Sequence, residues 1–350
     1  MKSWDVIIVG GGIIGLSLSI ALRKNGLRVL IVERGEPGRE ASHAAAGMLA
    51  SAAFDSLSPL RALARASAEM YPEFVHELQD ESGIHIDLRD KGTLDFSSTH
   101  GIDGEAEVVS LNELADLEPS LPETLGTAHY LSERSVDSRQ LVSAALKTAK
   151  HRGVDISSGT TVVEVLIADG RAIGVRTEKT SYASPTVVNC SGAWAGQFSP
   201  VAFPIRPVKG QVLSVVGGPK VNHVLIFADV YLVPRSDGRL LIGASVEEVG
   251  YDKRLDADVI KRLHQAAVSA IPALAGGKIL EMWAGLRPGT PDGLPALGAT
   301  TVPGYFIASG HFRDGILLAP ITAKVMAELI GGEKTECDLA AFAPMRFSKQ

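Results

Sequence analysis

The chain has 350 residues, of which 45% are hydrophobic and 21% charged, and its formal net charge at pH 7 is −6. This length provides a large core and suggests two domains, while the negative charge argues against binding to nucleic acid or to an anionic membrane surface. The two cysteines, Cys190 and Cys337, make no disulfide framework, which is typical of a cytoplasmic protein.

Residues 5–33 predict a strand, a glycine turn, a helix and a second strand. Gly10, Gly12 and Gly15 have the spacing G-x-G-x-x-G, an apolar helical pattern runs to residue 25, and Glu33 closes the second strand. In a dinucleotide-binding βαβ unit the first glycine permits the tight turn, the second lets the backbone approach a pyrophosphate, and the third lets helix and strand pack closely. The helix amino terminus then faces the phosphates, and the acid accepts a ribose hydroxyl.

The same apolar stretch could also be a signal peptide or a membrane anchor. However, Asp5 stands where such a segment has positive charge, no small-residue cleavage site follows, and three consecutive glycines weaken a helix that spans lipid. We therefore expect a dinucleotide-binding unit. An acid after the second strand suits the adenosine ribose of NAD or FAD, and the position of the motif near the amino terminus favours FAD.

The next part of the chain predicts helices and short strands in alternation. A small-residue segment at 41–48 precedes a helical pattern that runs from Leu60 to Leu78 and is closed by Gly83. Strands are expected at 85–88 and 93–96, on either side of a turn at 90–92. A helix at 137–152 has Asp137 or Ser138 as its cap, and strands follow near 161–167 and 172–177.

The second half of the chain is richer in strands. They are expected at 187–190, 211–216, 223–227, 230–234 and 239–243, the last two joined by a turn at 236–238, and later near 279–286 and 305–308. A helix at 256–271 ends at Pro272. The loop at 310–315 precedes a final helix that should start near Ile316. Because residues 315–332 include Pro320, Lys324 and Glu328, this helix should be buried and amphipathic and should not span a membrane.

Strand–helix alternation at both ends encloses two strand-rich stretches. This arrangement predicts a fold that is α/β plus α+β: a Rossmann-like FAD-binding domain with an inserted, mostly antiparallel-sheet substrate domain. The FAD-binding domain would comprise residues 1–85, 135–205 and 288–350, and the substrate domain residues 86–134 and 206–287. The inserted sheet would close over the cofactor and form a substrate pocket.

Several segments together resemble the FAD-dependent D-amino-acid oxidase superfamily, and most closely its glycine oxidases of the thiamine-biosynthesis type. They are the βαβ unit at 10–33, SHAAAGML at 42–49, PVKG at 207–210, YLVPR at 231–235, WAGLRPGT at 283–290 and GHFRDGILLAP at 310–320. The first is shared by many flavoproteins, whereas the segments at 283–290 and 310–320 are far more specific.

The resemblance implies which residues bind FAD and which bind substrate. Substrate would meet Arg287, Arg313 and Tyr231. Together with the glycines of the βαβ unit, the residues expected to contact FAD are Ile13, Ile14, Glu33, Arg34, Ala41, Ser42, Ala46, Gly47, Met48, Val162, His311, Phe312, Arg313, Asp314, Gly315, Ile316 and Leu317.

Physical arguments support these roles and leave alternatives open. Residues 42–48 have little side-chain bulk, so their amides could reach a flat isoalloxazine ring, although alone they would be an ordinary alanine-rich turn. The amino terminus of the last helix would favour reduction of the flavin.

The guanidinium of Arg287 can bind a carboxylate with two hydrogen bonds, whereas a solitary arginine is usually solvated. Tyr231 also fits a core position, and Arg313 could serve FAD through its backbone and substrate through its side chain.

The expected FAD is non-covalent. In some related amine dehydrogenases a histidine immediately before Ala-Ala-Gly carries the flavin, but here Ala44 holds that position and His43 lies one residue early. Cys190 and Cys337 do not match the flavin-linking cysteine of monomeric sarcosine oxidases. No His/Cys/Asp cluster has metal-ligand spacing, so no metal is expected.

The resemblance implies an FAD-dependent amine oxidase that deaminates glycine and other small amines or amino acids, such as sarcosine and small D-amino acids, to the imine or 2-oxo acid with release of hydrogen peroxide, in connection with thiamine thiazole synthesis. It also implies a homo-oligomer, with a tetramer among the options. No side chain is expected to act as a catalytic base, because the flavin N5 does the chemistry. The alternatives are a D-amino-acid or hydroxy-acid dehydrogenase that uses another electron acceptor, and a flavoprotein whose FAD is mainly structural.

Overall fold

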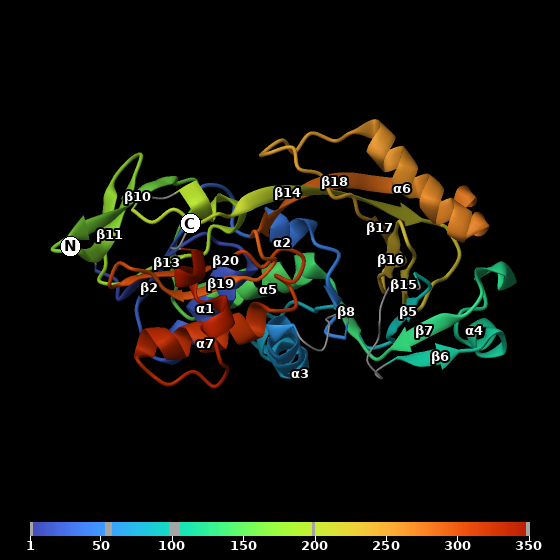
Figure 1. The fold of residues 1–350 in the computed structure, drawn as a ribbon, viewed down its shortest axis with the longest axis horizontal. Coiled ribbons are helices and arrows are strands. Elements are labelled where there is room, and N and C mark those ends of the chain that lie inside the picture. Colours follow the sequence, from blue (N-terminus) through green and yellow to red (C-terminus); the bar gives the residue numbers. More distant parts are fainter. Residues whose placement is uncertain (1–2, 53–57, 98–105, 198–199, 348–350) are drawn as a thin grey trace.

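Two sheets dominate the fold, one at each side of Figure 1. The computed structural model describes residues 3–52, 58–97, 106–197 and 200–347. The six-stranded sheet lies at the left of Figure 1 and the eight-stranded sheet at the right, where the long strands β14 (Arg206–Val216) and β18 (Lys278–Gly289) reach back towards the first sheet. The predicted fold class is confirmed.

The six-stranded sheet is a parallel sheet with one antiparallel edge strand. The neighbours of β1 (Val6–Val9) are β2 (Val29–Val32) and β13 (Val187–Asn189). Outside them lie β9 (Asp155–Ser157) and β20 (Tyr305–Ser309), also parallel, and β19 (Ala296–Ala299) pairs antiparallel with β20. The carboxyl ends of the parallel strands therefore meet at one edge, where ligands bind in sheets of this kind.

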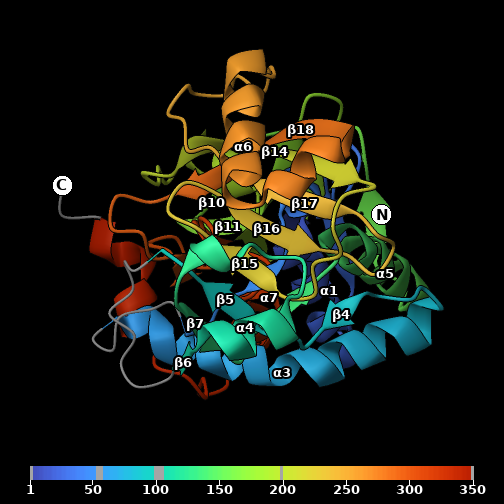
Figure 2. The same ribbon diagram turned by 90° about the vertical axis from the view of Figure 1, so that its right-hand side faces the viewer.

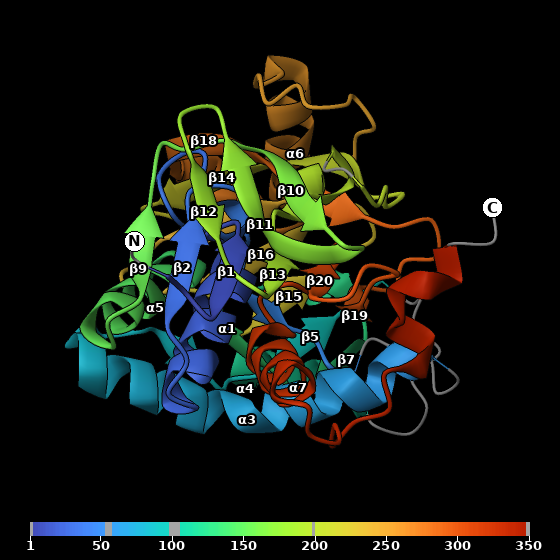
Figure 3. The same ribbon diagram turned by 90° about the vertical axis from the view of Figure 1, so that its left-hand side faces the viewer.

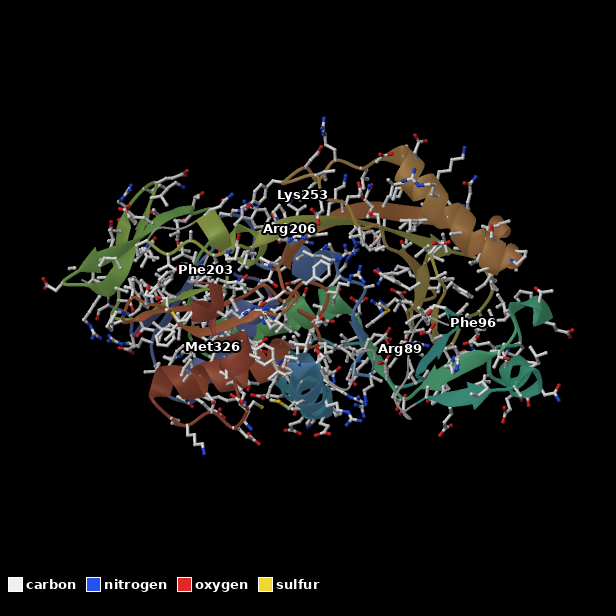
Figure 4. The ribbon with its side chains drawn as sticks, viewed as in Figure 1. Arg89, Phe96, Phe203, Arg206, Lys253 and Met326 are labelled. Atoms are coloured by element: carbon white, nitrogen blue, oxygen red, sulfur yellow. The ribbon has the colours of Figure 1, made fainter. Side chains whose placement is uncertain are left out.

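Both faces of this sheet are covered. Val6 and Ile8 of β1 pack into a core with residues of the helices, among them Met326. Ile7 packs on the opposite side with Phe203. Figure 4 shows Met326 and Phe203 on opposite sides of the sheet. In Figure 3 the helices α3 and α7 lie below the sheet and the small sheet β10–β12 above it. The helices are α1 (Ile13–Lys24), α3 (Pro59–Ser82), α5 (Ser138–His151) and α7 (Ala319–Gly331), and the strands are β10 (Val162–Ala168), β11 (Arg171–Thr177) and β12 (Ser181–Ala183).

The eight-stranded sheet has one face against α6 (Ala257–Ala270) and the other towards the first sheet. Leu213 of β14 packs with Leu263 of α6, while its neighbour Val212 packs with Ala46, as the two-residue period of a strand requires. Figure 2 shows α6 on the outside of this sheet. The strand order is β18-β14-β17-β16-β15-β5-β7-β6, with β5 (Thr93–Asp95), β6 (Glu107–Val109), β7 (Ala128–Leu131), β15 (Val224–Ile226), β16 (Tyr231–Pro234) and β17 (Leu240–Gly243).

Shorter elements connect the two parts. A three-stranded sheet joins β3 (Met48–Leu49), β8 (Arg134–Val136) and β4 (Leu88–Arg89), and the helices α2 (Ala41–Ala44) and α4 (Leu111–Leu117) lie in connecting segments. Among the described residues, no helix is long and apolar enough to cross a membrane. The 3₁₀ helices are Glu123–Leu125, Gly192–Gln197, Pro272–Gly276, Ala340–Phe342 and Pro344–Phe347.

The last helix begins at Ala319, three residues later than the expected start near Ile316. Pro320 has no N–H and cannot donate to the carbonyl of Ile316, as a helix starting earlier would require. The hydroxyl of Tyr71 donates to that carbonyl instead, and Ser67 Oγ donates to the carbonyl of Leu317 at 2.6 Å. Residues 315–318 therefore form a turn before the helix.

Candidate active site

A cavity of about 720 Å³ lies between the two sheets and has walls from both. One end is formed by the carboxyl ends of β1, β2 and β13 and by the start of α1. The other end is formed by β14, β16, β17 and β18, and the loop at 308–316 and the segment at 40–48 lie between the two ends. The position matches the rule that ligands bind beyond the carboxyl ends of parallel strands.

The glycines of the βαβ unit have the geometry that the motif predicts. Gly10 has φ of 108°, and a Cβ there would lie 2.5 Å from the carbonyl oxygen of Cys190. A Cβ on Gly15 would lie 2.1 Å from the carbonyl oxygen of Gly10, so α1 could not pack on β1 with a larger residue. Gly10 and Gly12 line the cavity, whereas Gly15 lies beneath it.

The amino terminus of α1 faces the cavity and offers free donors. Gly12 is its N-cap, and within the described ranges the amides of Gly12 and Ile14 have no hydrogen-bond partner. The amide of Ile13 donates to Ser42 Oγ at 3.0 Å. Free amides at a helix amino terminus, together with the helix dipole, favour an anion such as a pyrophosphate.

Glu33 lies at the end of β2 and is held by the backbone. Its Oε2 accepts the amide of Gly11 at 2.8 Å, and its Oε1 accepts the amide of Gly35 at 2.8 Å. Each carboxylate oxygen keeps a second lone pair, so Glu33 can still accept ribose hydroxyls from the cavity that it lines. The glycine cradle, the free amides and the acid fit the adenosine diphosphate part of FAD. The sequence did not indicate the two backbone donors.

An aromatic stack covers the cavity near Arg34. The guanidinium carbon of Arg34 lies 3.5 Å from the ring centroid of Trp194, and Trp194 stacks on Tyr251 at 5.5 Å between centroids. Arg34 also pairs with Glu40 at 2.9 Å, and Lys253 pairs with the same carboxylate at 2.9 Å. Lys253, labelled in Figure 4, belongs to the segment that connects β17 to α6 in the chain. This contact joins the two parts of the fold, and sequence reasoning missed both aromatic residues.

Arg287 and Tyr231 meet at the end of the cavity that the eight-stranded sheet forms. Arg287 Nη1 donates to the carbonyl of Ser245 at 3.1 Å. Burial lowers the pKa of Arg287 and raises that of Tyr231, and the neighbouring Arg287 charge opposes the rise in the pKa of Tyr231. At neutral pH the pair therefore consists of a fixed cation and a neutral phenol, both of which donate hydrogen bonds.

Two glycines make room for this pair, and neither was expected as a site residue. A Cβ on Gly210 would lie 2.4 Å from Arg287 Nη2, and a Cβ on Gly243 would lie 2.6 Å from the phenol of Tyr231. Gly210 is opposite Gly285 in the β14–β18 ladder, and Gly243 is opposite Tyr231 in the β16–β17 ladder. Sequence gives no local sign of these contacts, because they cross between strands.

The loop before α7 brings Arg313 and Asp314 to the cavity. Arg313 is exposed, with its guanidinium carbon 5.2 Å from the ring centroid of Phe312, and Phe312 has φ of 47°, which is rare for a residue with a side chain. Burial raises the pKa of Asp314 to about 7, against the opposing charge of Arg313. In the described part of the chain, the amides of Gly315 and Ile316 have no partner and line the cavity.

The structure brings nearly all the expected site residues together. Leu317 is the exception in this loop, because it is buried in the helical core and does not line the cavity. His43 also lies outside the cavity wall, whereas Cys190 is part of it, and burial raises the pKa of the Cys190 thiol. Over the ranges that the structure describes, no three His, Cys, Asp or Glu residues are grouped as metal ligands. Expected residues that line the cavity are Ile13, Ile14, Glu33, Arg34, Ala41, Ser42, Ala46, Gly47, Met48, Val162, Tyr231, Arg287, His311, Phe312, Arg313, Asp314, Gly315 and Ile316.

Residues 5–329 match the protein family described as FAD dependent oxidoreductase (DAO). A glycine oxidase of Geobacillus kaustophilus is 34% identical over 366 residues, covering 98% of this chain and 97% of the relative. The crystal structure of glycine oxidase from Geobacillus kaustophilus matches with a TM-score of 0.94 and 33% identity, over 99% of each chain. A bifunctional protein ThiO/ThiG of Synechocystis sp. is 36% identical over 357 residues, which are 98% of this chain but 54% of the relative. The chain thus spans about half the length of that bifunctional protein.

Glu33→Ala should weaken FAD binding while the variant stays folded. The change removes hydrogen bonds to a charged acceptor, which should cost on the order of 1.5–3 kcal/mol, or roughly a tenfold to hundredfold loss of affinity. The affinity is measured by titrating FAD into the apoprotein and following flavin fluorescence. Glu36→Ala is the matched control, since Glu36 is an exposed acid of the same segment that does not line the cavity. An unchanged affinity for FAD in Glu33→Ala would show that Glu33 does not bind the ribose.

Proposed function

Since the chain belongs to the family of FAD dependent oxidoreductases (DAO) and uses FAD, we propose that it oxidatively deaminates glycine and other small amino acids or amines, including sarcosine and small D-amino acids. When bound, FAD would supply the two-electron oxidation of the substrate, with oxygen as the final electron acceptor and hydrogen peroxide as its product. For glycine the balance is glycine, oxygen and water to glyoxylate, ammonia and hydrogen peroxide. The proposal includes a link to thiamine thiazole synthesis and a homo-oligomeric, cytoplasmic enzyme.

The observation that carries this proposal is the Arg287–Tyr231 pair at the inner end of the cavity. A half-buried guanidinium and a neutral phenol form a site for one carboxylate. Because strand β18 fixes Arg287 and the adjoining Pro288 stiffens the chain, a carboxylate bound there holds the attached α-carbon in one place. Fixed placement of this kind supplies a large part of the rate enhancement when the reacting partner is also fixed.

Apart from Asp229 and Arg313, which also line the cavity, the remaining walls at this end are largely apolar. Val212, Ile226, Phe227, Val246 and Leu286 line the same cavity as Arg287. Apolar walls exclude water and favour the neutral amine over the ammonium form of the substrate, and only the neutral amine can release a hydride from its α-carbon. No side chain is needed as a base for this step, which agrees with the neutral state of Tyr231.

Air-equilibrated protein with glycine should produce hydrogen peroxide in proportion to glyoxylate. Peroxide is measured by a coupled peroxidase assay, and glyoxylate as its hydrazone. Under the same conditions a dehydrogenase would require an artificial electron acceptor, and a protein with structural FAD would not be reduced by any of the amino acids. The proposed oxidase would be contradicted if peroxide formed only with an artificial electron acceptor present, or if the flavin were not reduced at all, and if sarcosine and D-alanine also gave no peroxide in air.

Acid precipitation should release the flavin into the supernatant. His43 lies outside the cavity wall, and a buried thiol such as Cys190 with a raised pKa is a weak nucleophile, so neither residue is placed to form a bond with the cofactor. The absorbance of pellet and supernatant at the visible flavin bands is the measurement. Colour that stays with the denatured protein would show a covalent link.

Arg287→Leu should abolish useful turnover of glycine while FAD remains bound. An unpaired buried substrate carboxylate typically costs roughly 2–5 kcal/mol, which corresponds to at least about thirtyfold in kcat/KM. Arg287→Lys should recover only part, because a point charge does not orient the carboxylate, and Tyr231→Phe should be milder. Gly210→Ala should act in the same direction as Arg287→Leu, because its Cβ would displace the guanidinium.

The control for these variants is Gly276→Ala, whose Cβ would meet no atom within 4 Å. Steady-state kinetics and FAD content are measured for every variant. If Arg287→Leu kept a near-normal kcat/KM with full FAD content, the carboxylate would have to bind elsewhere, and Arg313 would become the leading candidate.

A further inference from the structure

The turn at 43–47, which includes the last two residues of α2, has each of its backbone carbonyls bonded to a donor from another segment. The donors come from α5, from the end of β8, from β18 and from Arg235, which directly follows β16, so both parts of the fold contribute. The contacts are His43 O with Arg139 Nε at 3.4 Å, Ala44 O with Trp283 Nε1 at 3.0 Å, Ala45 O with Ser138 Oγ at 2.6 Å, Ala46 O with Arg235 Nη2 at 2.6 Å and Gly47 O with the amide of Val136 at 2.8 Å.

These bonds determine where the amides of the turn point. In a trans peptide the N–H of one residue points away from the carbonyl of the residue before it. The carbonyls of Ala45 and Ala46 point towards Ser138 and Arg235, so the amides of Ala46 and Gly47 point the other way, towards the cavity that both residues line. In the described part of the chain neither amide has a hydrogen-bond partner. The turn therefore presents two free donors to the cofactor.

Arg235 is the donor best placed to hold this arrangement. It is only 5% exposed and directly follows β16, and its Nη1 has no partner within the described ranges. Asp137 lies 3.6 Å from its Nε and is itself 3% exposed. A hydrogen bond from a charged donor is stronger than one between neutral groups, and a buried guanidinium has little freedom to leave its acceptor.

Gly47 shows how tightly the turn is packed around this contact. It has φ of 71°, and a Cβ there would lie 1.9 Å from the carbonyl oxygen of Val136 and 3.5 Å from Arg235 Nη2. The carbonyl of Val136 and the guanidinium of Arg235 therefore both pack against the Cα of Gly47 and leave no room for a side chain there. If the guanidinium were lost, the Ala46 carbonyl would be the group left without a partner, and the peptide between Ala46 and Gly47 would be free to rotate.

We propose that Arg235 is a positioning residue of the flavin site, which keeps the amides of Ala46 and Gly47 directed at the isoalloxazine of FAD by holding the Ala46 carbonyl. Donors that are fixed in advance stabilise charge as it develops and need no reorganisation at that moment. Because an isoalloxazine gains electron density on reduction, Arg235 would raise the midpoint potential of the bound FAD. The proposal concerns the cofactor and does not depend on which amino acid is the substrate.

The test compares Arg235→Met with Arg239→Met in the FAD-loaded enzyme. Methionine keeps much of the apolar stem of Arg235 and removes the donor. Arg239 is the matched control, because it binds the same Asp137 at 3.0 Å and has no hydrogen bond to the turn. The readouts are the midpoint potential of FAD, its visible absorption spectrum, and kcat and KM for glycine measured separately.

Arg235→Met should lose about tenfold in its preference for reduced over oxidised FAD, which for a two-electron couple is a fall of about 30 mV in midpoint potential. The visible spectrum should shift and kcat should fall, with KM within about twofold of wild type because Arg287 is untouched. Arg239→Met should keep the wild-type potential and spectrum. Arg235→Lys should recover part of the loss, since one ammonium can still donate to the Ala46 carbonyl.

Two results would overturn the proposal. One is a wild-type potential and spectrum in Arg235→Met. The other is an equal fall of potential in Arg239→Met, which would assign the effect to the charge of the cluster and not to the bond with the turn. If Arg235→Met does not fold, Arg235→Lys and Ser138→Ala carry the test, because Ser138→Ala removes the neighbouring bond to the Ala45 carbonyl. An unchanged midpoint potential of FAD in both of these variants would refute the proposed positioning role of Arg235.

Discussion

The segments around the cavity pack so closely that some positions in its wall have no room for a Cβ atom. A Cβ on Gly285 would lie 2.5 Å from the Cβ of Ala44, and one on Gly47 would lie 1.9 Å from the carbonyl oxygen of Val136. With so little side-chain bulk, backbone amides form much of the wall. A flat cofactor with hydrogen-bond acceptors at its edges requires a wall of this kind, and the rest of the site is arranged around it.

Two strands of the eight-stranded sheet connect the cofactor turn with the substrate end of the cavity. β18 carries Trp283, whose indole N–H donates to the Ala44 carbonyl, and also Arg287. β16 begins with Tyr231, and Arg235 follows its last residue. In each strand the paired residues are separated by an even number of positions, so they share a face. The residues that hold the turn at 43–47 and those proposed to bind a carboxylate are therefore fixed by the same two strands.

The features of the fold and of the site that depend on local sequence could be predicted, and those that depend on contacts between distant segments could not. The βαβ unit and the caps at Asp137 and Gly83 follow from residue spacing and from the conformational preferences of those residues. α7 begins at Ala319 because Pro320 has no N–H, and because the hydroxyls of Ser67 and Tyr71 in α3 donate to the carbonyls before the helix. Gly210 and Gly243, and the stack of Arg34 on Trp194, have no local signature, since their neighbours come from other strands and loops.

We propose that this cavity holds FAD with the α-carbon of a small amino acid beside it. Mixing the FAD-loaded protein with glycine in the absence of oxygen, and following the visible flavin absorbance in a stopped-flow instrument, tests it most directly. The absorbance should bleach in a single turnover and return when oxygen is admitted. A flavin that stays fully oxidised with glycine, sarcosine and D-alanine would contradict it.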